Sequence, residues 1–235
     1  VKPPHLGDVV DKLAASPKIV VAALFGTTFG GGLEVALGCN YRIALASGKV
    51  GLPEVKLGII PGAQGTQRLP RLTGAEFALK LITSGNPISS AEALAAGAID
   101  RITEENIVEA AVEFAEELVL CKAPLRKSHE LVIDSSKFDE AYFNTFRTSI
   151  ARRTRGMDAP ECCIQAVKAA VELPFLDGVN RERELSRSCI QNPQSKALQH
   201  VFFAERAATK VPGLKKDAEL FPINRVGIIG AGTMG

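Results

Sequence analysis

The 235-residue sequence lacks a long apolar run, an internal repeat and any marked excess of one charge. No window reaches the roughly 18 uncharged apolar residues that a membrane-spanning helix needs, because glycine and threonine interrupt the most apolar stretch, residues 19–32. With 28 Lys plus Arg against 26 Asp plus Glu, the net charge is only +2, so we expect neither a membrane span nor nucleic-acid binding. The remaining composition, 46% hydrophobic and 23% charged, indicates a globular chain of one large domain or slightly more.

Cysteine is sparse and irregularly placed. The five cysteines are odd in number and show neither a disulfide framework nor the spacing of metal ligands, and the first residues carry no signal-peptide pattern. We therefore expect a reducing compartment, no secretion and no metal site. The five are Cys39, Cys121, Cys162, Cys163 and Cys189.

The sequence also lacks an initiator methionine, because it begins Val1-Lys-Pro-Pro. At its other end, residues 223–235 have the pattern of a buried strand that enters a glycine turn, where the sequence stops. A strand of this kind needs the helix that follows it. The pattern predicts that the chain is a fragment of a longer protein.

Short apolar strands alternate with helices over the first half of the sequence, which predicts an α/β fold with parallel crossover connections. Lys18–Phe25 is rich in β-branched residues and continuously apolar, as in a strand covered on both faces. Ser89-Ser-Ala-Glu92 is a capping box that begins a helix. The predicted strands are 18–25, 41–46, 49–52 and 99–102, and the predicted helices are 6–15, 33–37, 67–84, 89–96 and 106–120.

Beyond about Cys121 the strand patterns end, and residues 138–210 are predicted to be helical, with breaks at Pro160, Pro174 and Pro193. A local basic run lies in this part of the chain. We expect it to be a solvated face; the alternative is that it contacts the phosphates of a ligand. The run comprises Arg147, Arg152, Arg153 and Arg155.

Three consecutive glycines, Gly30, Gly31 and Gly32, lie between a predicted strand and a predicted helix. Glycine permits positive φ and lets a ligand approach the main chain, and a helix start presents unpaired N–H groups and the positive end of the helix dipole. This is the geometry of an oxyanion hole. The alternative is a tight strand-to-helix turn with no further role.

Two glutamates stand alone in apolar surroundings near this turn. Glu34 lies one turn into the predicted helix, and Glu54 follows 20 residues later. Where two carboxyl groups share a site, their repulsion separates their pKa values, so that one can act as an acid and the other as a base. Taken singly, each could be a surface glutamate, with Glu54 paired to Lys56 or Arg68. Together with the glycine turn, they predict a catalytic pair.

The chain resembles the enoyl-CoA hydratase/isomerase (crotonase) superfamily, with matching spacing from about Lys18 to Ile102. The resemblance rests on two stretches, Phe29-Gly-Gly-Gly-Leu-Glu-Val-Ala-Leu-Gly-Cys-Asn-Tyr-Arg-Ile-Ala and Val50-Gly-Leu-Pro-Glu-Val-Lys-Leu-Gly-Ile-Ile-Pro-Gly-Ala-Gln-Gly-Thr-Gln-Arg-Leu-Pro-Arg. Further on, Gln194-Ser-Lys-Ala-Leu-Gln-His-Val-Phe-Phe-Ala-Glu-Arg is similar to the linker helix of the multifunctional β-oxidation enzymes, peroxisomal type 1 and its bacterial relatives.

A dinucleotide fingerprint follows that linker. Gly230-Ala-Gly-Thr-Met-Gly235 is a G-x-G-x-x-G motif preceded by the strand-like run Arg225–Ile229, which predicts that Gly230, Gly232 and Gly235 bind the pyrophosphate of NAD. The acidic residue that would bind the ribose lies outside the sequence. NAD is therefore expected as a cofactor of the longer protein.

The resemblance implies a partial crotonase-like (ClpP/crotonase) domain at residues 1–123, a helical linker at 124–221, and the first strand and glycine turn of a Rossmann domain at 222–235. It also implies the roles of the site residues. Glu34 matches the glutamate that orients and deprotonates the attacking water, and Glu54 the one that exchanges a proton with the acyl α-carbon. The Gly31 N–H matches one oxyanion donor, and Gly62 a backbone donor near the water.

By this resemblance the chain is the enoyl-CoA hydratase part of a bifunctional β-oxidation enzyme, which adds water to a 2-trans-enoyl-CoA thioester and oxidises the product with NAD. The alternatives are Δ3,Δ2-enoyl-CoA isomerisation at the same site and a non-catalytic acyl-CoA-binding fragment or scaffold. The family's other oxyanion donor and an adenine-binding loop precede the matched region, so the fragment alone is expected to be inactive. A bacterial parent would be cytoplasmic with a thiolase partner, and a eukaryotic parent peroxisomal.

Overall fold

The computed structural model describes residues 4–208, 210, 213 and 221–232. The chain divides into two units, Val1–His200 and Val201–Gly235, and the candidate acids Glu34 and Glu54 both lie in the first. Among the helices of the described part, none combines the length and apolarity needed to cross a membrane.

The first unit contains two small sheets through which the chain passes in turn. One sheet has the order β1-β3-β6 and is parallel throughout; the other has the order β2-β4-β5, with β2 and β4 parallel and β5 antiparallel to β4. The predicted α/β class with parallel crossovers is confirmed. The strands are β1 (Val21–Leu24), β2 (Thr27–Phe29), β3 (Tyr41–Leu45), β4 (Lys49–Gly51), β5 (Ile88–Ser89) and β6 (Arg101–Thr103).

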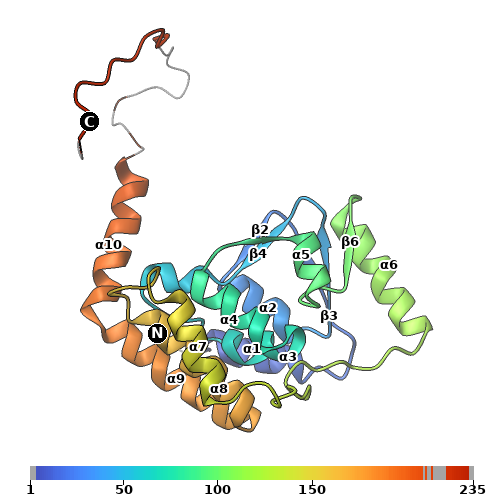
Figure 1. The fold of residues 1–235 in the computed structure, drawn as a ribbon. Coiled ribbons are helices and arrows are strands. Elements are labelled where there is room, and N and C mark those ends of the chain that lie inside the picture. Colours follow the sequence, from blue (N-terminus) through green and yellow to red (C-terminus); the bar gives the residue numbers. More distant parts are fainter. Residues whose placement is uncertain (1–3, 209, 211–212, 214–220, 233–235) are drawn as a thin grey trace. The chain divides into compact units, whose positions relative to one another are not determined.

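Helices pack around these sheets, and turns and irregular segments connect the elements. Helix α6 packs on β1 and β3, whereas α8 packs against α3 and α4, and α9 packs against α3 and α8 (Figure 1). The helices are α1 (Leu6–Ala14), α2 (Gly31–Gly38), the 3₁₀ helix η1 (Pro53–Leu57), α3 (Gly65–Thr73), α4 (Ala75–Ser84), α5 (Ser90–Ala95), α6 (Ile107–Leu120), α7 (Glu140–Ile150), α8 (Ala159–Glu172), α9 (Phe175–Gln191) and α10 (Pro193–Ala208).

The structure differs from the sequence-based prediction in one helix and one strand, each for an identifiable reason. The single helix predicted over 67–84 is two helices, because Gly74 has φ 80 and ψ 155, a backbone conformation that ends α3 before α4 begins. The glycine-rich turn also contains a strand, β2, whose pairing with β4 depends on residues about 20 positions away and leaves no local signal.

The predicted helix breaks at three prolines and the predicted helix cap at Ser89 are confirmed. Pro160 lies in the first turn of α8, Pro174 is the N-cap of α9 and Pro193 is the first residue of α10, the positions where a missing N–H costs least. Ser89 caps α5, accepting a hydrogen bond from the Glu92 N–H at 3.2 Å.

Helices α7 to α9 share one apolar core with the α/β part. Leu33 of α2, Ile82 of α4, Phe143 of α7, Val167 of α8 and Leu185 of α9 belong to a single buried cluster. Burying a side chain of this size stabilises a fold by about 1.5–3 kcal/mol. The helical part is therefore packed into the same unit as the sheets, and the division at residues 123 and 221 stays a prediction.

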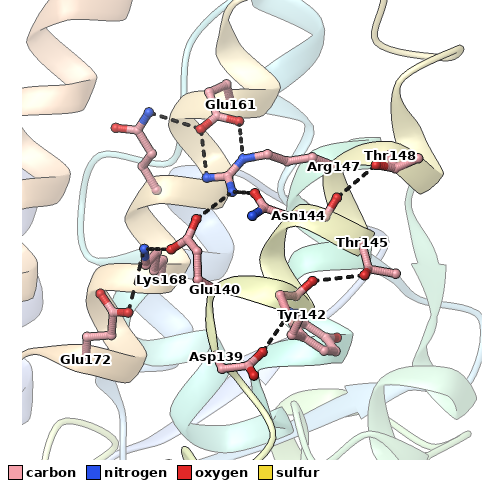
Figure 2. A network of polar contacts seen from close by, with 12 residues as sticks. Asp139, Glu140, Tyr142, Asn144, Thr145, Arg147, Thr148, Glu161, Lys168 and Glu172 are labelled. Carbon is pink, nitrogen blue, oxygen red and sulfur yellow. Dashed lines mark hydrogen bonds and ion pairs between the residues drawn. The ribbon is translucent and has the colours of Figure 1, made fainter.

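A polar network fixes α7 against α8 (Figure 2). Arg147 makes a two-point pair with Glu161, with Nε to Oε2 at 2.9 Å and Nη2 to Oε1 at 3.0 Å, and it also contacts Glu140 at 3.4 Å. Lys168 pairs with the same Glu140 and with Glu172. The guanidinium of Arg147 is thus matched by carboxylates of its own fold, which favours the solvated-face interpretation over phosphate binding at this residue.

Candidate active site

The glycine turn joins β2 to α2 and is tied to the end of β4. Gly30 is the N-cap of α2 with φ 55 and ψ −128, and its N–H donates to the Gly51 carbonyl at 2.9 Å. Gly31 and Gly32 begin the helix, where the N–H groups have no acceptor within the helix itself. The amide of Gly31, the predicted oxyanion donor, therefore lies at the positive end of the α2 dipole.

Glu34 lies in the first turn of α2 and is 3% exposed. Its Oε1 accepts two backbone hydrogen bonds, from the Ala63 N–H at 2.8 Å and the Gly65 N–H at 2.9 Å. Burial raises the pKa of Glu34, and these two donors oppose the shift because they stabilise the carboxylate. Both bonds reach Oε1, and Oε2 accepts neither of them.

Glu54 lies in η1, the 3₁₀ helix that follows β4, and its Oε1 lies close to Gly30 at the start of α2. Its Oε2 is buried without a hydrogen-bond partner among the described residues. Burial, followed by the charge of Glu34, raises the pKa of Glu54 to about 8. The carboxyl group of Glu54 lies against Gly30, which is the N-cap of the helix that carries Glu34, so the structure places both acids at the same end of α2, from segments separated by a crossover.

The simpler interpretation of Glu54 as a paired surface residue is wrong. Lys56 donates to Asn86 at 3.1 Å, and Arg68 donates to Gln64 at 2.8 Å. With neither cation on its carboxyl group and one oxygen unpartnered, Glu54 has the features of an acid that exchanges a proton with a ligand.

Gly30 and Gly65 leave room for the carboxyl groups of the two acids, a role that the sequence did not predict for either glycine. A Cβ on Gly30 would lie 2.8 Å from Glu54 Oε1, and one on Gly65 would lie 2.8 Å from Glu34 Oε1. Any larger residue would displace a carboxyl group. The spacing Pro61-Gly-Ala-Gln-Gly65 was visible in the sequence, but the closeness of Gly65 to Glu34 depends on tertiary packing.

Gly62 precedes Ala63, one of the two residues whose N–H groups bind Glu34, and it lies next to α9. A Cβ on it would approach Ser186 Oγ at 2.8 Å, and it lines a cavity of about 530 Å³ together with Gly7 of α1 and Arg183 of α9. The N–H groups that bind Glu34 belong to its neighbours Ala63 and Gly65. The role of Gly62 as a donor near the water stays a prediction.

An apolar cavity of about 610 Å³ lies on another face of α2. Gly32, Val35, Ala36 and Cys39 line it from the helix, together with residues of β1 and β2. These four positions share one helical face, whereas Glu34 projects from a different one. The cavity is therefore not the space that the two acids share.

The predicted NAD-binding residues lie in the second unit. Gly230 has φ 101, as a glycine turn requires, and a Cβ on Gly232 would meet no atom within 4 Å; Gly235 lies outside the described residues. Residues 221–230 show no strand or helix, and Arg225–Ile229 are exposed. Residues 221–232 do not form the strand, turn and helix of a dinucleotide site, and NAD binding stays a prediction.

The cysteines are less scattered in the fold than in the sequence. Cys163 and Cys189 are buried in the core between α8 and α9, and the half-buried Cys162 lies near Cys189. Within the described residues, no group of three His, Cys, Asp or Glu side chains is arranged to hold a metal ion.

These features agree with comparisons to known proteins. The enoyl-CoA hydratase/isomerase family model matches residues 4–142, more than half of the chain. The chain belongs to the enoyl-CoA hydratase/isomerase family.

Full-length relatives are longer. The chain is 45% identical to the peroxisomal bifunctional enzyme of Homo sapiens over 234 residues, which cover 98% of this chain and 32% of the human protein. It is 37% identical to the glyoxysomal fatty acid beta-oxidation multifunctional protein MFP-a of Cucumis sativus over 232 residues, 97% of this chain and 32% of that protein. The chain thus spans about a third of the length of the curated relatives it matches.

Solved structures share the fold. The carnitinyl-CoA hydratase of Mycobacterium avium superposes with a TM-score of 0.53 at 27% identity, covering 79% of this chain and 59% of that one. An enoyl-CoA hydratase from Mycobacterium avium subsp. paratuberculosis, 19% identical, gives a TM-score of 0.57 over 85% of this chain and 69% of its own. The predicted crotonase-like fold is confirmed; the Rossmann part stays a prediction.

Proposed function

We propose that this chain supplies the hydratase site of a bifunctional β-oxidation enzyme, which adds water across the double bond of a 2-trans-enoyl-CoA. The observation that carries the proposal is the placement of two acids beside the amide-lined start of α2: Glu34, which is buried, and Glu54, which is half-buried with its Oε2 atom enclosed. The family match and the bifunctional relatives support it.

In the proposed reaction the two acids divide the proton transfers. Glu34, fixed through Oε1 by two amides, accepts a proton from water through Oε2 as the water oxygen bonds to the β-carbon. Glu54, whose pKa of about 8 keeps it protonated at neutral pH, gives its proton to the α-carbon. One water is consumed, one C–O and one C–H bond form, and exchange with solvent restores both carboxyl groups.

The Gly31 N–H supports this reaction at the thioester. As the double-bond electrons move toward the carbonyl, negative charge develops on its oxygen, and an amide at a helix N-terminus stabilises that charge. One such donor is worth about 2.7–4 kcal/mol of barrier in comparable sites. This stabilisation favours a coenzyme A thioester over a free acid as substrate. The thioester oxygen gains negative charge during the reaction, whereas a carboxylate is charged from the start.

The activity of the whole protein is part of the same proposal. The peroxisomal and glyoxysomal relatives support oxidation of the 3-hydroxyacyl-CoA product with NAD in a longer protein, with Gly230, Gly232 and Gly235 at its dinucleotide turn, and a peroxisomal location in a eukaryote. In a bacterium, we propose a cytoplasmic enzyme that works with a thiolase.

Isomerisation of a 3-enoyl-CoA at the same site is the second candidate. The buried Oε2 of Glu54, which has no hydrogen-bond partner among the described residues, favours it, because an ionised carboxyl group can remove a proton from the α-carbon and return it to the γ-carbon without water.

Replacement of Glu34 separates the two candidates. In the intact protein, we expect Glu34→Ala to lower the hydration of crotonyl-CoA by about 10²–10⁴-fold, because the general base for water is lost, and to preserve most isomerase activity. Loss of the conjugated thioester absorbance measures hydration. Glu76→Gln, an exposed glutamate paired with Lys80, is the matched control. Equal loss of both activities in Glu34→Ala would contradict this division of roles.

A further inference from the structure

Four consecutive backbone amides at the start of α3 bind two different glutamates in alternation. The N–H groups of Ala63 and Gly65 donate to Glu34 at 2.8 and 2.9 Å. Those of Gln64 and Thr66 donate to Glu182 at 2.7 and 3.1 Å. We call residues 63–66 the amide ladder. Successive amides of a turning chain point in different directions, so the two carboxyl groups bind the ladder from two sides.

Glu182 comes from α9, 118 positions away from Gln64 in the sequence, and is fully buried. An isolated buried carboxyl group is costly unless it is well hydrogen-bonded. Here it accepts three bonds, the third from the Thr66 hydroxyl at 2.5 Å. A polar group with this cost and this set of partners fixes its surroundings more strictly than an apolar side chain would.

The amide ladder needs such support because its backbone is strained. Gln64 has φ 78, the left-handed region that a non-glycine residue seldom adopts. Its side chain is held as well, with Nε2 donating to Asp11 at 2.7 Å and Oε1 accepting from Arg68 at 2.8 Å. Without the acceptor supplied by Glu182, the Gln64 N–H would be buried and unpaired, and the segment could relax away from Glu34.

Helix α9 is packed unusually close to α3 at this point. A Cβ on Gly178, one turn before Glu182, would lie 2.2 Å from Gln67 Oε1. Gln67 Nε2 in turn donates to Thr66 Oγ1 and to the Ala166 carbonyl, both at 2.9 Å. This connected network places the carboxyl group of Glu182 within reach of the ladder.

We propose that Glu182 is a positioning residue for the hydratase site, which orients the carboxyl group of Glu34 by holding the amide ladder between them. The role rests on the proposed function, since Glu34 is its target. Glu182 does not touch the reacting atoms; it acts through Ala63 and Gly65, whose amides alternate with the two that it binds. The charged groups that act on it are Glu34 and Arg68.

The test uses the intact protein with Glu182→Gln, which preserves size but turns one acceptor into a donor facing an N–H or a hydroxyl. We expect kcat for crotonyl-CoA hydration to fall by about 10–100-fold, as for a misplaced catalytic group, with KM changed less than about threefold. Thr66→Val, which removes one donor to Glu182, should give a smaller loss of the same kind, and Thr66→Ser should restore it.

Glu184→Gln is the matched control, since Glu184 lies two residues after Glu182 in α9, is exposed and pairs only with Arg181 among the described residues. A kcat of Glu182→Gln within twofold of the control would overturn the positioning role, even if the variant melted at a lower temperature. If Glu182→Gln does not fold, unchanged kcat in Thr66→Val would overturn it equally. Absence of hydration by the unaltered protein would instead overturn the proposed function and this role with it.

Discussion

Replacing Gly30 with alanine separates the backbone role of the glycine turn from its role in holding Glu54. Gly30 has φ 55 and ψ −128, and a residue with a Cβ in such a region costs about 1–3 kcal/mol of stability. The added Cβ would also lie 2.8 Å from Glu54 Oε1, against 3.4 Å for ordinary contact, so the carboxyl group must move by about 0.6 Å or more. Since misplacement of a reacting group by about 1 Å can cost 10²-fold, we expect kcat to fall by about 10-fold or more.

Gly26 supplies the matched control within the same segment. It has φ 59, but a Cβ on it would meet no atom within 4 Å, so Gly26→Ala introduces positive-φ strain without touching a carboxyl group. Urea unfolding should show a loss of stability in both variants, whereas the crotonyl-CoA absorbance assay should show a loss of kcat only in Gly30→Ala. Equal loss of kcat in the two variants, or unchanged kcat in Gly30→Ala, would refute the placement of Glu54 against the turn.

Two further predictions concern pH and the basic run. Because the pKa of Glu54 is raised from 4.5 to about 8 on folding, the folded state binds its proton more tightly than the unfolded state, so stability falls as pH rises from about 4.5 to about 8. Glu54→Gln should reduce this decline in urea unfolding measured across the range, and an unchanged decline would contradict the shift. Arg147→Ala should cost about 1 kcal/mol or less and leave KM for the enoyl-CoA unchanged, because its partners are Glu140 and Glu161; a raised KM would indicate phosphate contact.

The part of the site that the sequence could predict is the part that breaks a local pattern. Glu34 and Glu54 are single acids in apolar runs, and Gly30 to Gly32 interrupt a strand-to-helix junction, so each conflicts with simple burial and signals chemistry. Strand β3 was predictable because its apolar residues are buried, whereas the prediction for β1, which has the same apolar pattern, is wrong in one respect: Ala23 is exposed, so this strand is not covered on both faces. Pairings between distant short segments, such as β2 with β4, have no such local signature.

Glu182 was hidden by the opposite effect, because its surroundings in the sequence are polar. It lies in Asn180-Arg-Glu-Arg-Glu, which has the composition of a solvated helix face. Only the helical period distinguishes it: the buried residues of α9 are Gly178, Val179, Glu182, Leu185 and Cys189, which follow one another at intervals of one, three and four residues.

That stripe connects the helical part of the chain to the chemistry of the α/β part. A glutamate at a core position of α9 would destabilise the helix packing unless the facing surface offered donors, and the facing surface here is the amide ladder that also holds Glu34. Glu34 of α2 and Glu182 of α9 therefore constrain each other through the four amides of the ladder. If Glu182 positions Glu34 as we propose, the hydratase site depends on α9 as well as on the elements that supply Glu34 and Glu54.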